Sequence, residues 1–579
     1  MSGSQLKDTE FDYIVVGAGS AGCIVAARLT EDSSVKVLLV EAGGSDRSLF
    51  IAMPGALPFV YENERIQWGY QSGPEPQLNG KTIDEKAGKV IGGSSSINAM
   101  IYNRGNPMDY DGWADDRLTD WDYAHCLPYF RKMETFADGP NEWRGGSGPL
   151  HINRCRAEHK LYHAFLRGGE QAGFEVTPDH NGYRQEGLHV AQVFIHNGVR
   201  WSASRAYLRP AMKRPNLRVL PKTLVSRILI EDGTAVGIEI VTRGDKRRIT
   251  CEREVIVSAG AVNSPKLLML SGVGDPEELR QLGINVVAAV PEVGRNLQNH
   301  PGVDIQFTTR AEDSLTAALG MFGRVKLAAD WVLRRKGLGT TNFFETGAFL
   351  RVRDDVAFPN MQYEFLPLAR KLRNGKLVPI PGFQFWMDLS RPESRGFIKL
   401  RSTNPADAPL TVFNHLESRQ DMQDLIAGVR LARTLMRQSA WESYRAQEFT
   451  PGPDVESDSE IEAFIRRATG TSYHPSGACR MGADPEAVVD SEGRMNAVRG
   501  MRVVDASIMP KVITGNLNAP VMMMAEKIAD RIVGRTPLAP SDAVYYRAAR
   551  VSEGGQGSAR GRDPDALRRA TRPSGEADA

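Results

Sequence analysis

The sequence predicts an α/β protein, α+β overall, in which a doubly wound parallel-sheet domain is interrupted by an inserted antiparallel sheet covered by helices. Three observations predict this fold. An apolar run near the N-terminus leads directly into a glycine-rich turn, as the first strand of a parallel sheet does. Residues 341–402 alternate strand-like runs with Gly and Pro. Residues 420–437 carry apolar side chains at a helical period.

The first element is a buried strand over Phe11–Val16, which delivers the chain into a turn of the form GxGxxG. Each glycine has its own physical task in a dinucleotide cradle. Gly17 makes the tight turn, Gly19 lets the backbone approach a pyrophosphate, and Gly22 lets the following helix pack close on the strand. The phosphates then lie at a helix N-terminus, so the unit predicts a Rossmann-like dinucleotide site.

The second strand covers residues 35–40 and ends at Glu41. A carboxylate at this place can accept hydrogen bonds from ribose hydroxyls, which supports the dinucleotide site. The unit does not decide between FAD and a nicotinamide dinucleotide.

Two further glycine-rich blocks favour FAD. Residues 88–98 and 260–274 resemble, position by position, the two signatures of the glucose-methanol-choline (GMC) flavoprotein oxidoreductases. The resemblance covers roughly residues 10 to 540. It is closest to the bacterial choline dehydrogenase group, which residues 337–345 and 504–510 look like. It implies FAD as cofactor, an alcohol as substrate, and oxidation of that alcohol at its CH–OH group.

The resemblance also assigns the residues expected to contact FAD. They lie in the first glycine turn, at the end of the second strand, in the first signature, and at three later positions: Gly17, Gly19, Ser20, Ala21, Gly22, Glu41, Ala42, Val90, Gly92, Gly93, Ser94, Asn98, Ala99, Met100, Ile101, Val225, Asp505 and Asn518. Choline oxidases of the family tether FAD through a histidine just before the asparagine of the first signature. Ile97 stands there in this chain, so we expect noncovalent FAD.

Two residues near the C-terminus are expected to carry the chemistry. His474 occupies the position of the family's catalytic histidine, and an imidazole with an ordinary pKa near 6.5 suits removal of a hydroxyl proton. Asn516 occupies the second catalytic position, which is Asn in the choline group, and its amide can donate to the developing alkoxide. The sequence predicts a helix over residues 521–532 with Asn518 as N-cap and Pro520 in the first turn, its positive end towards the flavin.

Substrate recognition is less well determined by the sequence. Tyr473, Phe385 and Glu345 are candidate substrate-binding residues, because aromatic rings and a carboxylate suit a quaternary ammonium. Phe343, Phe344 and Trp386 are further aromatic candidates in the same region. The basic segment of residues 369–376 would instead suit an acidic substrate. Choline and an aliphatic or aromatic primary alcohol therefore both stay open.

The spacing of the FAD elements predicts a discontinuous FAD-binding domain, because they are too far apart for one continuous domain. We expect this domain over residues 10–155, 200–310 and 465–540, a substrate-binding domain over 156–199 and 311–464, and a disordered tail over 553–579. Strand-like runs at residues 217–220, 227–231 and 237–241 predict a β-meander in the FAD domain. The helix of residues 420–437 should cover the antiparallel sheet.

Composition bounds the class of protein. The 579 residues are 41% hydrophobic and 25% charged, as in an ordinary globular protein, and the net charge of +2 indicates no nucleic-acid partner. Five scattered cysteines without a CxxC suggest neither a disulfide framework nor a zinc site, and they fit a reducing cytoplasm. Neither a signal peptide nor a spanning helix is expected, whereas peripheral contact with the inner face of a membrane stays open.

The sequence leaves rival functions open. An oxidase would pass electrons to O2, whereas a dehydrogenase would use a quinone or a dye-like acceptor. A lyase or decarboxylase on the same fold is a second rival, and a nonenzymatic flavin-binding protein is a third. The pair His474 and Asn516 favours oxidation over both of these.

Overall fold

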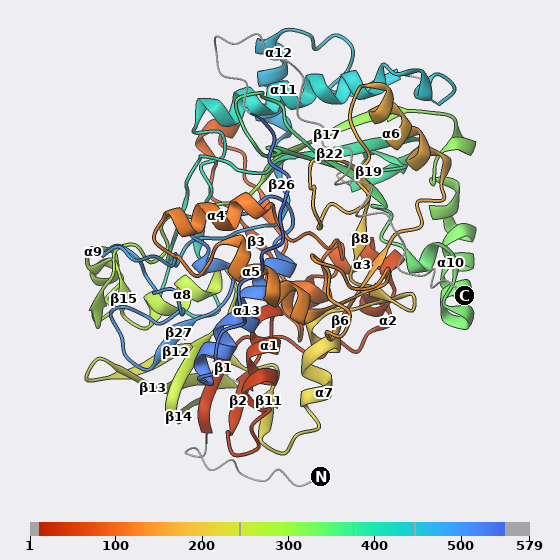
Figure 1. Ribbon diagram of the computed structural model, residues 1–579. Helices are drawn as coiled ribbons and strands as arrows, with labels where there is room; N and C mark the ends of the chain where they lie inside the picture. The colour runs from red at the N-terminus through yellow and green to blue at the C-terminus, as the bar shows by residue number, and fades with distance from the viewer. Residues whose placement is uncertain (1–10, 243–244, 374–375, 445–446, 550–579) are drawn as a thin grey trace.

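The computed structural model describes residues 11–242, 245–373, 376–444 and 447–549. Two seven-stranded sheets dominate this part of the chain, and each has a hydrophobic core of its own (Figure 1). The mixed α/β architecture predicted from the sequence is therefore confirmed. The predicted tail over residues 553–579 lies outside the described residues.

The first sheet is parallel around the N-terminal strand β1 (Phe11–Val16). Its strand order is β11-β2-β1-β14-β13-β12, and β27 pairs with β14. Apart from Asp12, β1 is apolar and buried, which is typical of a strand covered on both faces. The other strands are β2 (Val37–Val40), β11 (Leu217–Leu220), β12 (Leu224–Glu231), β13 (Thr234–Thr242), β14 (Asp245–Val257) and β27 (Met501–Val503).

The predicted meander is correct in part. Strands β12, β13 and β14 are consecutive and antiparallel, so the sheet does carry added antiparallel strands. Residues 217–220, however, form β11, which pairs in parallel with β2 at the far edge of the sheet. Pro221 follows β11 directly and lacks an N–H, so the strand cannot continue into β12. The open edge of β2 is satisfied by β11 instead.

Helices α1 (Ser20–Leu29) and α13 (Asn518–Ile532) pack against each other beside this sheet (Figure 1). The faces that meet are mostly apolar, and a cluster of charged side chains joins the C-terminal parts of the two helices. Arg28 lies 3.2 Å from the Glu526 carboxylate and 2.6 Å from the Asp530 carboxylate. The N-terminal end of the chain and its last long helix are thus fixed side by side.

The second sheet is antiparallel, with the order β25-β17-β22-β19-β18-β7 and β26 paired to β17. Its strands are β7 (Gly187–Val190), β17 (Pro301–Thr308), β18 (Thr346–Leu350), β19 (Met361–Leu366), β22 (Gly382–Leu389), β25 (Gln447–Thr450) and β26 (Gly470–Thr471). Helix α11 (Arg419–Met436) covers one face, as predicted for residues 420–437 (Figure 1). Two hairpins stand apart from it: β20 (Ala369–Arg373) with β21 (Lys376–Ile380), and β23 (Phe397–Lys399) with β24 (Leu410–Val412).

The remaining elements surround these two sheets. The helices are α2 (Leu49–Ala52), α3 (Leu57–Tyr61), α4 (Pro107–Asp115), α5 (Tyr123–Met133), α6 (Lys160–Gln171), α7 (Arg209–Ala211), α8 (Asn263–Leu270), α9 (Pro276–Gln281), α10 (Met321–Arg334) and α12 (Asp458–Ala468). The short strands are β3 (Tyr70–Gln71), β4 (Asp84–Glu85), β5 (Glu134–Phe136), β6 (Leu150–Arg154), β8 (Gln192–Val193), β9 (Ile195–His196), β10 (Val199–Arg200), β15 (Val273–Gly274) and β16 (Ala288–Ala289). None of the helices within the described ranges has both the length and the apolar character needed to traverse a bilayer.

We propose one change to the expected domain boundaries. The expected FAD domain includes residues 301–308, but these residues form β17, a central strand of the second sheet. β26 at residues 470–471 pairs with the same strand. A boundary just before Pro301, and a return just after Thr471, keeps each sheet within one domain.

Candidate active site

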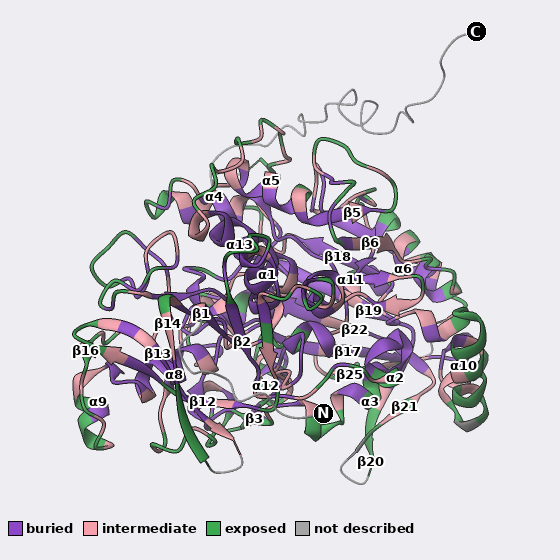
Figure 2. Ribbon diagram, turned by 90° about the horizontal axis from the view of Figure 1, so that it is seen from below, coloured by how far each residue is buried: buried purple, intermediate pink, exposed green. Residues whose placement is uncertain are grey.

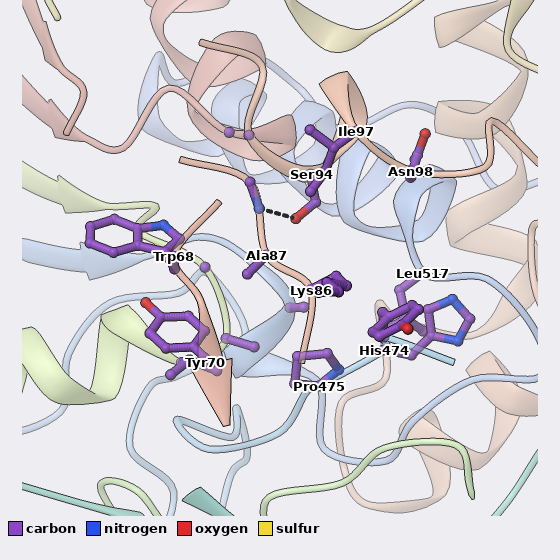
Figure 3. Close-up of a pocket in the computed structure, with 18 of the residues that line it drawn as sticks. Trp68, Tyr70, Lys86, Ala87, Ser94, Ile97, Asn98, His474, Pro475 and Leu517 are labelled. Carbon is purple, nitrogen blue, oxygen red and sulfur yellow. Dashed lines mark hydrogen bonds between the residues drawn. The ribbon is translucent and has the colours of Figure 1, made fainter. Parts of the chain in front are cut away.

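A cavity of about 720 Å³ runs from the first glycine turn to the edge of the antiparallel sheet. Its size lies in the range of about 300–1,000 Å³ that is usual for ligand sites. Gly17 and Glu41 line one end, whereas Glu364 and Trp386, from β19 and β22, line the other. Figure 3 shows part of the wall, where Ile97 and Asn98 lie on one side and His474 and Pro475 on another. The cavity therefore joins the two sheets.

The glycine end has the form that a dinucleotide needs. Gly17 has φ +99, and a Cβ there would lie 2.4 Å from the Ser258 carbonyl oxygen. A Cβ on Gly22 would lie 1.9 Å from the Gly17 carbonyl oxygen, so only glycine lets α1 pack this closely. Gly19 is the N-cap of α1 and offers no capping side chain. The first N–H groups of α1 are left for an anionic ligand, and these residues fit a pyrophosphate.

Most residues expected to contact FAD line this cavity. Gly22, Val90 and Gly92 do not. Gly22 lies behind the turn, and Val90 is packed in a small apolar cluster with Ile97. Gly92 has φ +88, and a Cβ at this position would lie 2.2 Å from the Ser96 hydroxyl oxygen. Gly92 therefore permits the tight turn of the signature loop without facing the cavity. These three residues support the wall and do not form its surface.

Glu41 lies in the wall but is already engaged with the glycine turn. Its carboxylate accepts hydrogen bonds from the Ala18 N–H at 2.8 Å and from the Gly43 N–H at 2.6 Å. Burial raises the pKa of Glu41 to about 7, although the two N–H donors oppose that rise. The side chain thus connects the turn after β1 to the turn after β2. The part of Glu41 that lines the cavity is the part that would face a ribose.

The predicted N-cap of α13 is wrong. The helix begins at Asn518 itself, and its N-cap is Leu517, which makes no side-chain capping bond. The Asn518 Oδ1 accepts a hydrogen bond of 2.7 Å from the Ser20 hydroxyl, so it is not available to cap its own helix. This bond joins the starts of α1 and α13 at the cavity. The first N–H groups of α13 consequently stay free of a side-chain cap, which preserves the expected positive end.

His474 and Asn516 meet at the other end of the cavity. The His474 Nε2 lies 3.3 Å from the Asn516 Nδ2. On its other side the His474 Nδ1 lies 2.9 Å from the Nδ1 of His300. Burial, followed by the neighbouring His300, lowers the pKa of His474 well below its ordinary value. The imidazole is therefore neutral near pH 7.

The orientation of the Asn516 amide is fixed by its neighbours. Its Oδ1 accepts from the Asn103 Nδ2 at 2.5 Å and from the Gln362 Nε2 at 3.4 Å. Its Nδ2 must then point to His474, which requires a lone pair on the His474 Nε2 and a proton on its Nδ1. Asn103 is held in turn by the His180 Nε2, 2.9 Å from its Oδ1. Neither Asn103 nor Gln362 was predicted from the sequence.

Two buried carboxyl groups beside this pair were also missed. The Glu364 Oε1 accepts from the Asn516 Nδ2 at 3.4 Å, and the Asp388 Oδ2 accepts from the Ser472 hydroxyl at 2.6 Å. Burial raises the pKa of Glu364 to about 8, and the nearby Asp388 adds to the rise. Burial raises the pKa of Asp388 to about 7. An acidic residue inside a mostly apolar, buried strand was the available signal for both.

The strand period explains which aromatic candidates reach the cavity. In β22, Gln384 and Trp386 line it, whereas Phe385 points to the opposite face. Phe385 is fully buried among Phe165 and Phe365, so its predicted substrate role is wrong. The rings of Tyr61, Phe344, Trp386 and Tyr473 are the ones that line the substrate end of the cavity.

Three other expectations for the substrate end change as well. Glu345 is buried outside the cavity wall, where its carboxylate accepts a hydrogen bond of 2.6 Å from the Ala157 N–H. Phe343 is packed in an apolar cluster with Trp331. From the basic segment, Arg370 does line the cavity, but it lies 3.0 Å from the Asp304 carboxylate. Its charge is thus paired, which weakens the case for an acidic substrate.

The fold and the cavity together define a flavin-dependent oxidoreductase. Models of the GMC oxidoreductase family match residues 11–302 and 392–525. The oxygen-dependent choline dehydrogenase of Brucella anthropi is 45% identical over 92% of this chain and 97% of its own. The oxygen-dependent choline dehydrogenase of Chromohalobacter salexigens is 44% identical over 93% of this chain and 98% of its own. The chain belongs to the GMC oxidoreductase family.

Solved structures agree. Pyridoxine 4-oxidase from Mesorbium loti matches with a TM-score of 0.82 and 28% identity, covering 91% of this chain and 100% of its own. A formate oxidase from Aspergillus oryzae, studied for its FAD modification, matches with a TM-score of 0.86 and 25% identity over 92% and 99%. The chain is thus a flavoprotein that uses FAD and oxidises alcohols at CH–OH groups.

Proposed function

We propose that this protein oxidises choline, or a close cationic analogue, to the aldehyde, with His474 as base and Asn516 as hydrogen-bond donor. The observation that carries the proposal is the 3.3 Å pair formed by the His474 Nε2 and the Asn516 Nδ2 at the cavity wall. A hydroxyl oxygen that lies within hydrogen-bond distance of both atoms can give its proton to the imidazole and accept from the amide. When bound, FAD supplies the acceptor for the hydride that leaves the carbinol carbon.

The low pKa of His474 suits this role. A histidine that stays neutral at working pH keeps its Nε2 lone pair for the hydroxyl proton. The protonated His474 Nδ1 donates to the Nδ1 of His300 at 2.9 Å, and this contact holds the ring plane. The Asn516 amide cannot act as a base, but its N–H can stabilise charge on the substrate oxygen as the proton leaves.

The substrate end favours a cation. The rings of Tyr61, Phe344, Trp386 and Tyr473 line it, and aromatic faces attract a quaternary ammonium by about 0.5–2 kcal/mol each. Glu364 adds a carboxyl group whose ionised form a cation would stabilise. Two curated relatives named for choline support the same substrate. An uncharged primary alcohol is the alternative, because it needs the catalytic pair but neither the rings nor Glu364.

The electron acceptor is proposed by class. Candidate acceptors are a quinone, a dye-like acceptor or O2, and the word oxygen-dependent in the names of the curated relatives makes O2 the first to test. Peroxide formation compared with dye reduction separates the oxidase from the dehydrogenase. We further propose a cytoplasmic location, either free or at the inner face of the membrane.

Anaerobic bleaching of the flavin absorption tests the function. We expect choline to bleach it rapidly, and its uncharged isostere 3,3-dimethyl-1-butanol to do so with weaker binding. His474→Ala should slow bleaching by about two to four orders of magnitude while FAD stays bound. Bleaching of that variant at the normal rate would remove His474 from the mechanism. Equal affinity for the two alcohols would assign an uncharged substrate.

The same preparation tests the attachment of FAD. Ile97 lines the cavity where a tethering histidine would stand, and an alkyl side chain forms no bond to a flavin. Acid or heat should therefore release all the flavin from the polypeptide. Flavin that stays with the denatured chain would contradict this.

A further inference from the structure

Helix α10 (Met321–Arg334) presents two apolar faces, and only one of them is packed. Leu327 and Trp331, four residues apart, are buried against the protein. The opposite face carries large apolar side chains that face solvent. The exposed fractions are 84% for Phe322, 66% for Val325 and 53% for Val332.

The exposed positions form a continuous stripe. Phe322, Val325 and Val332 are separated by three and seven residues, and Ala329 fills the turn between the last two. Leu333, 80% exposed, widens the stripe at its end. Side chains of this size rarely line the outer face of a helix unless that face meets another apolar phase.

Neighbouring helices extend the stripe into a patch. In α2 and α3, the exposed fractions are 65% for Leu49, 53% for Phe50 and 44% for Phe59. The Arg324 guanidinium lies over the Phe59 ring at 5.7 Å, which places α3 beside α10. Leu49 and Trp331 line one shallow hollow, so α2 is adjacent too. Figure 2 shows α10 with much green on the outer rim, with α2 and α3 next to it. We call these exposed side chains of α2, α3 and α10 the apolar rim.

The charges beside the apolar rim are mostly positive. Within residues 321–336 there are five cations, Arg324, Lys326, Arg334, Arg335 and Lys336, and a single carboxylate, Asp330. Asp330 is paired with Lys326 at 2.6 Å, and the Arg335 guanidinium lies 3.6 Å from the centre of the Trp331 ring. Arg47, exposed, precedes α2. Glu62 and Glu64 follow the C-terminal end of α3.

We propose that the apolar rim docks on the surface of a bilayer that contains anionic lipid. An interfacial helix needs an apolar face that enters the acyl boundary and basic residues that reach the headgroups, and α10 has both. Long basic side chains at the end of α10 can extend to phosphates while Val332 and Leu333 enter the apolar region. A second protein is the less suitable occupant, because the cations would need a matching acidic surface.

Docking in this orientation brings the cavity close to the bilayer. α3 ends at Tyr61, whose ring lines the substrate end of the cavity. The hairpin of β20 and β21, which Figure 2 draws on the same side, exposes Leu372 and contributes Leu377 to the cavity wall. An apolar acceptor dissolved in the lipid could therefore reach the cavity from the docked face. The docking itself does not depend on which alcohol is oxidised.

Vesicle sedimentation of the full-length holoenzyme tests the proposal. The probes are vesicles of phosphatidylcholine alone and vesicles that also contain phosphatidylglycerol. We expect sedimentation with the anionic vesicles, reduced at high salt, and little with the neutral ones. The triple variant Phe322→Ser, Val325→Ser, Leu333→Ser should bind these vesicles at least about tenfold more weakly, because it removes apolar side chains that would enter the bilayer. All three side chains are exposed, so the fold should be unaffected.

Two further proteins control the comparison. The triple variant Met212→Ser, Val287→Ser, Phe449→Ser removes exposed apolar side chains outside the apolar rim and should bind vesicles like the unchanged protein. The double variant Arg334→Glu, Lys336→Glu should lose the salt-dependent part of binding without touching the apolar stripe. Alcohol oxidation with a soluble dye and the thermal midpoint should be normal in all three.

Failure to sediment with anionic vesicles at low salt would overturn the proposal, and so would undiminished binding of the rim variant. A change from dimer to monomer in the rim variant, without vesicle binding by the unchanged protein, would assign the rim to a second copy of the chain instead.

Discussion

At the scale of single residues, the meeting of His474 and Asn516, the proposed catalytic pair, was predictable, and the residues around them were not. His474 and Asn516 each follow from a local motif, and the structure brings them together although 42 residues separate them. Glu364 and Asp388 belong to strands whose pairing depends on the whole sheet, so their meeting beside Asn516 could not be read from local pattern. Phe385 was misplaced because a one-residue shift along a strand exchanges the two faces of a sheet.

Asn103 should act as a positioning residue for Asn516. It donates the 2.5 Å hydrogen bond that turns the Asn516 N–H groups towards His474. Asn103→Leu removes this donor, so kcat should fall while the KM for the alcohol changes little. The loss should be smaller than that of Asn516→Ala, for which we expect about tenfold to a thousandfold. Stopped-flow flavin reduction measures both.

A merely structural role for Asn103 predicts a different pattern. It would lower the thermal midpoint and FAD content together with the rate, and Asn103→Gln would not restore activity. In the double variant Asn103→Leu, Asn516→Ala, a positioning role predicts almost no loss beyond that of Asn516→Ala alone, because the two act as a unit. Additive losses would argue against it.

The raised pKa of Glu364 predicts a pH dependence that only a cationic substrate shows. In the free protein this carboxyl is neutral below about 8 and ionised above it. Since a cation binds the ionised form better, kcat/KM for choline should rise with pH through that region. The uncharged 3,3-dimethyl-1-butanol should lack this rise, and Glu364→Gln should remove it for choline.

The kcat profile gives the control. Bound choline stabilises the carboxylate and lowers the pKa of Glu364 in the complex. The rise with pH seen in kcat/KM should therefore be absent from kcat near pH 8. An identical step for both alcohols would place its origin in another group, and His474 is excluded because its pKa is shifted downward.

At the scale of elements, the first glycine turn and α1 were predicted well because their geometry is dictated locally. A positive φ at Gly17 and the close approach at Gly22 admit no other residue. The start of α13 was predicted less well. Asn518 has the character of an N-cap, but its side chain is taken by Ser20, almost 500 positions earlier. The parallel pairing of β11 with β2 was also missed. It depends on a free edge of β2 that exists only in the assembled sheet, so local sequence does not indicate it.

Two glycines of this turn offer a matched pair of substitutions. Gly22→Ala puts a Cβ 1.9 Å from the Gly17 carbonyl oxygen, which must push α1 away from β1. We expect loss of FAD together with a lower thermal midpoint, at a cost of about 1–3 kcal/mol or more. Gly19→Ala meets only the Ser258 carbonyl oxygen at 3.9 Å.

Gly19→Ala should therefore fold normally and weaken FAD binding alone, because its methyl group enters the space of the ligand. Thermal unfolding of the apoprotein and titration with FAD distinguish the two variants. Equal midpoints for Gly22→Ala and the unchanged apoprotein would contradict the packing argument, and unchanged FAD affinity in Gly19→Ala would move the pyrophosphate elsewhere.

At the scale of the whole molecule, the presence of two sheets was predictable, because each has its own sequence pattern: an apolar run before a glycine turn for the first, and alternating strand-like runs over residues 341–402 for the second. The point at which the chain passes between the sheets was not. Residues 301–308 and 470–471 fall within the expected FAD-binding domain, yet they form β17 and β26, which pair in the second sheet, and β26 ends three residues before His474. The cavity exists only because both sheets contribute walls to it, so its substrate residues depend on the packing of the entire chain.

The C-terminal segment gives a prediction at this scale. Residues up to 549 are described, and Tyr545 and Tyr546 pack as expected for a docked end. The Tyr545 ring meets Tyr123 edge-on at 5.5 Å, and its hydroxyl donates to the Asp111 carboxylate. The Tyr546 N–H donates to the Tyr183 carbonyl oxygen at 2.8 Å. The Tyr545 contacts attach the segment to α4 and α5, and the Tyr546 contact attaches it to the loop between α6 and β7.

Ending the chain at residue 552 keeps both tyrosines and removes only a polar remainder with too few apolar side chains to order a core. Turnover, FAD content and thermal midpoint should be unchanged. Ending it at residue 540 removes both rings, and the midpoint should fall. The two rings are half-buried, so each should contribute only part of the about 1.5–3 kcal/mol that full burial of a large apolar side chain supplies. Calorimetry of the two truncated proteins makes the comparison. A loss of flavin in the longer one would mean that residues beyond 552 contact the folded protein, and an unchanged midpoint in the shorter one would mean that the tyrosine contacts contribute no stability.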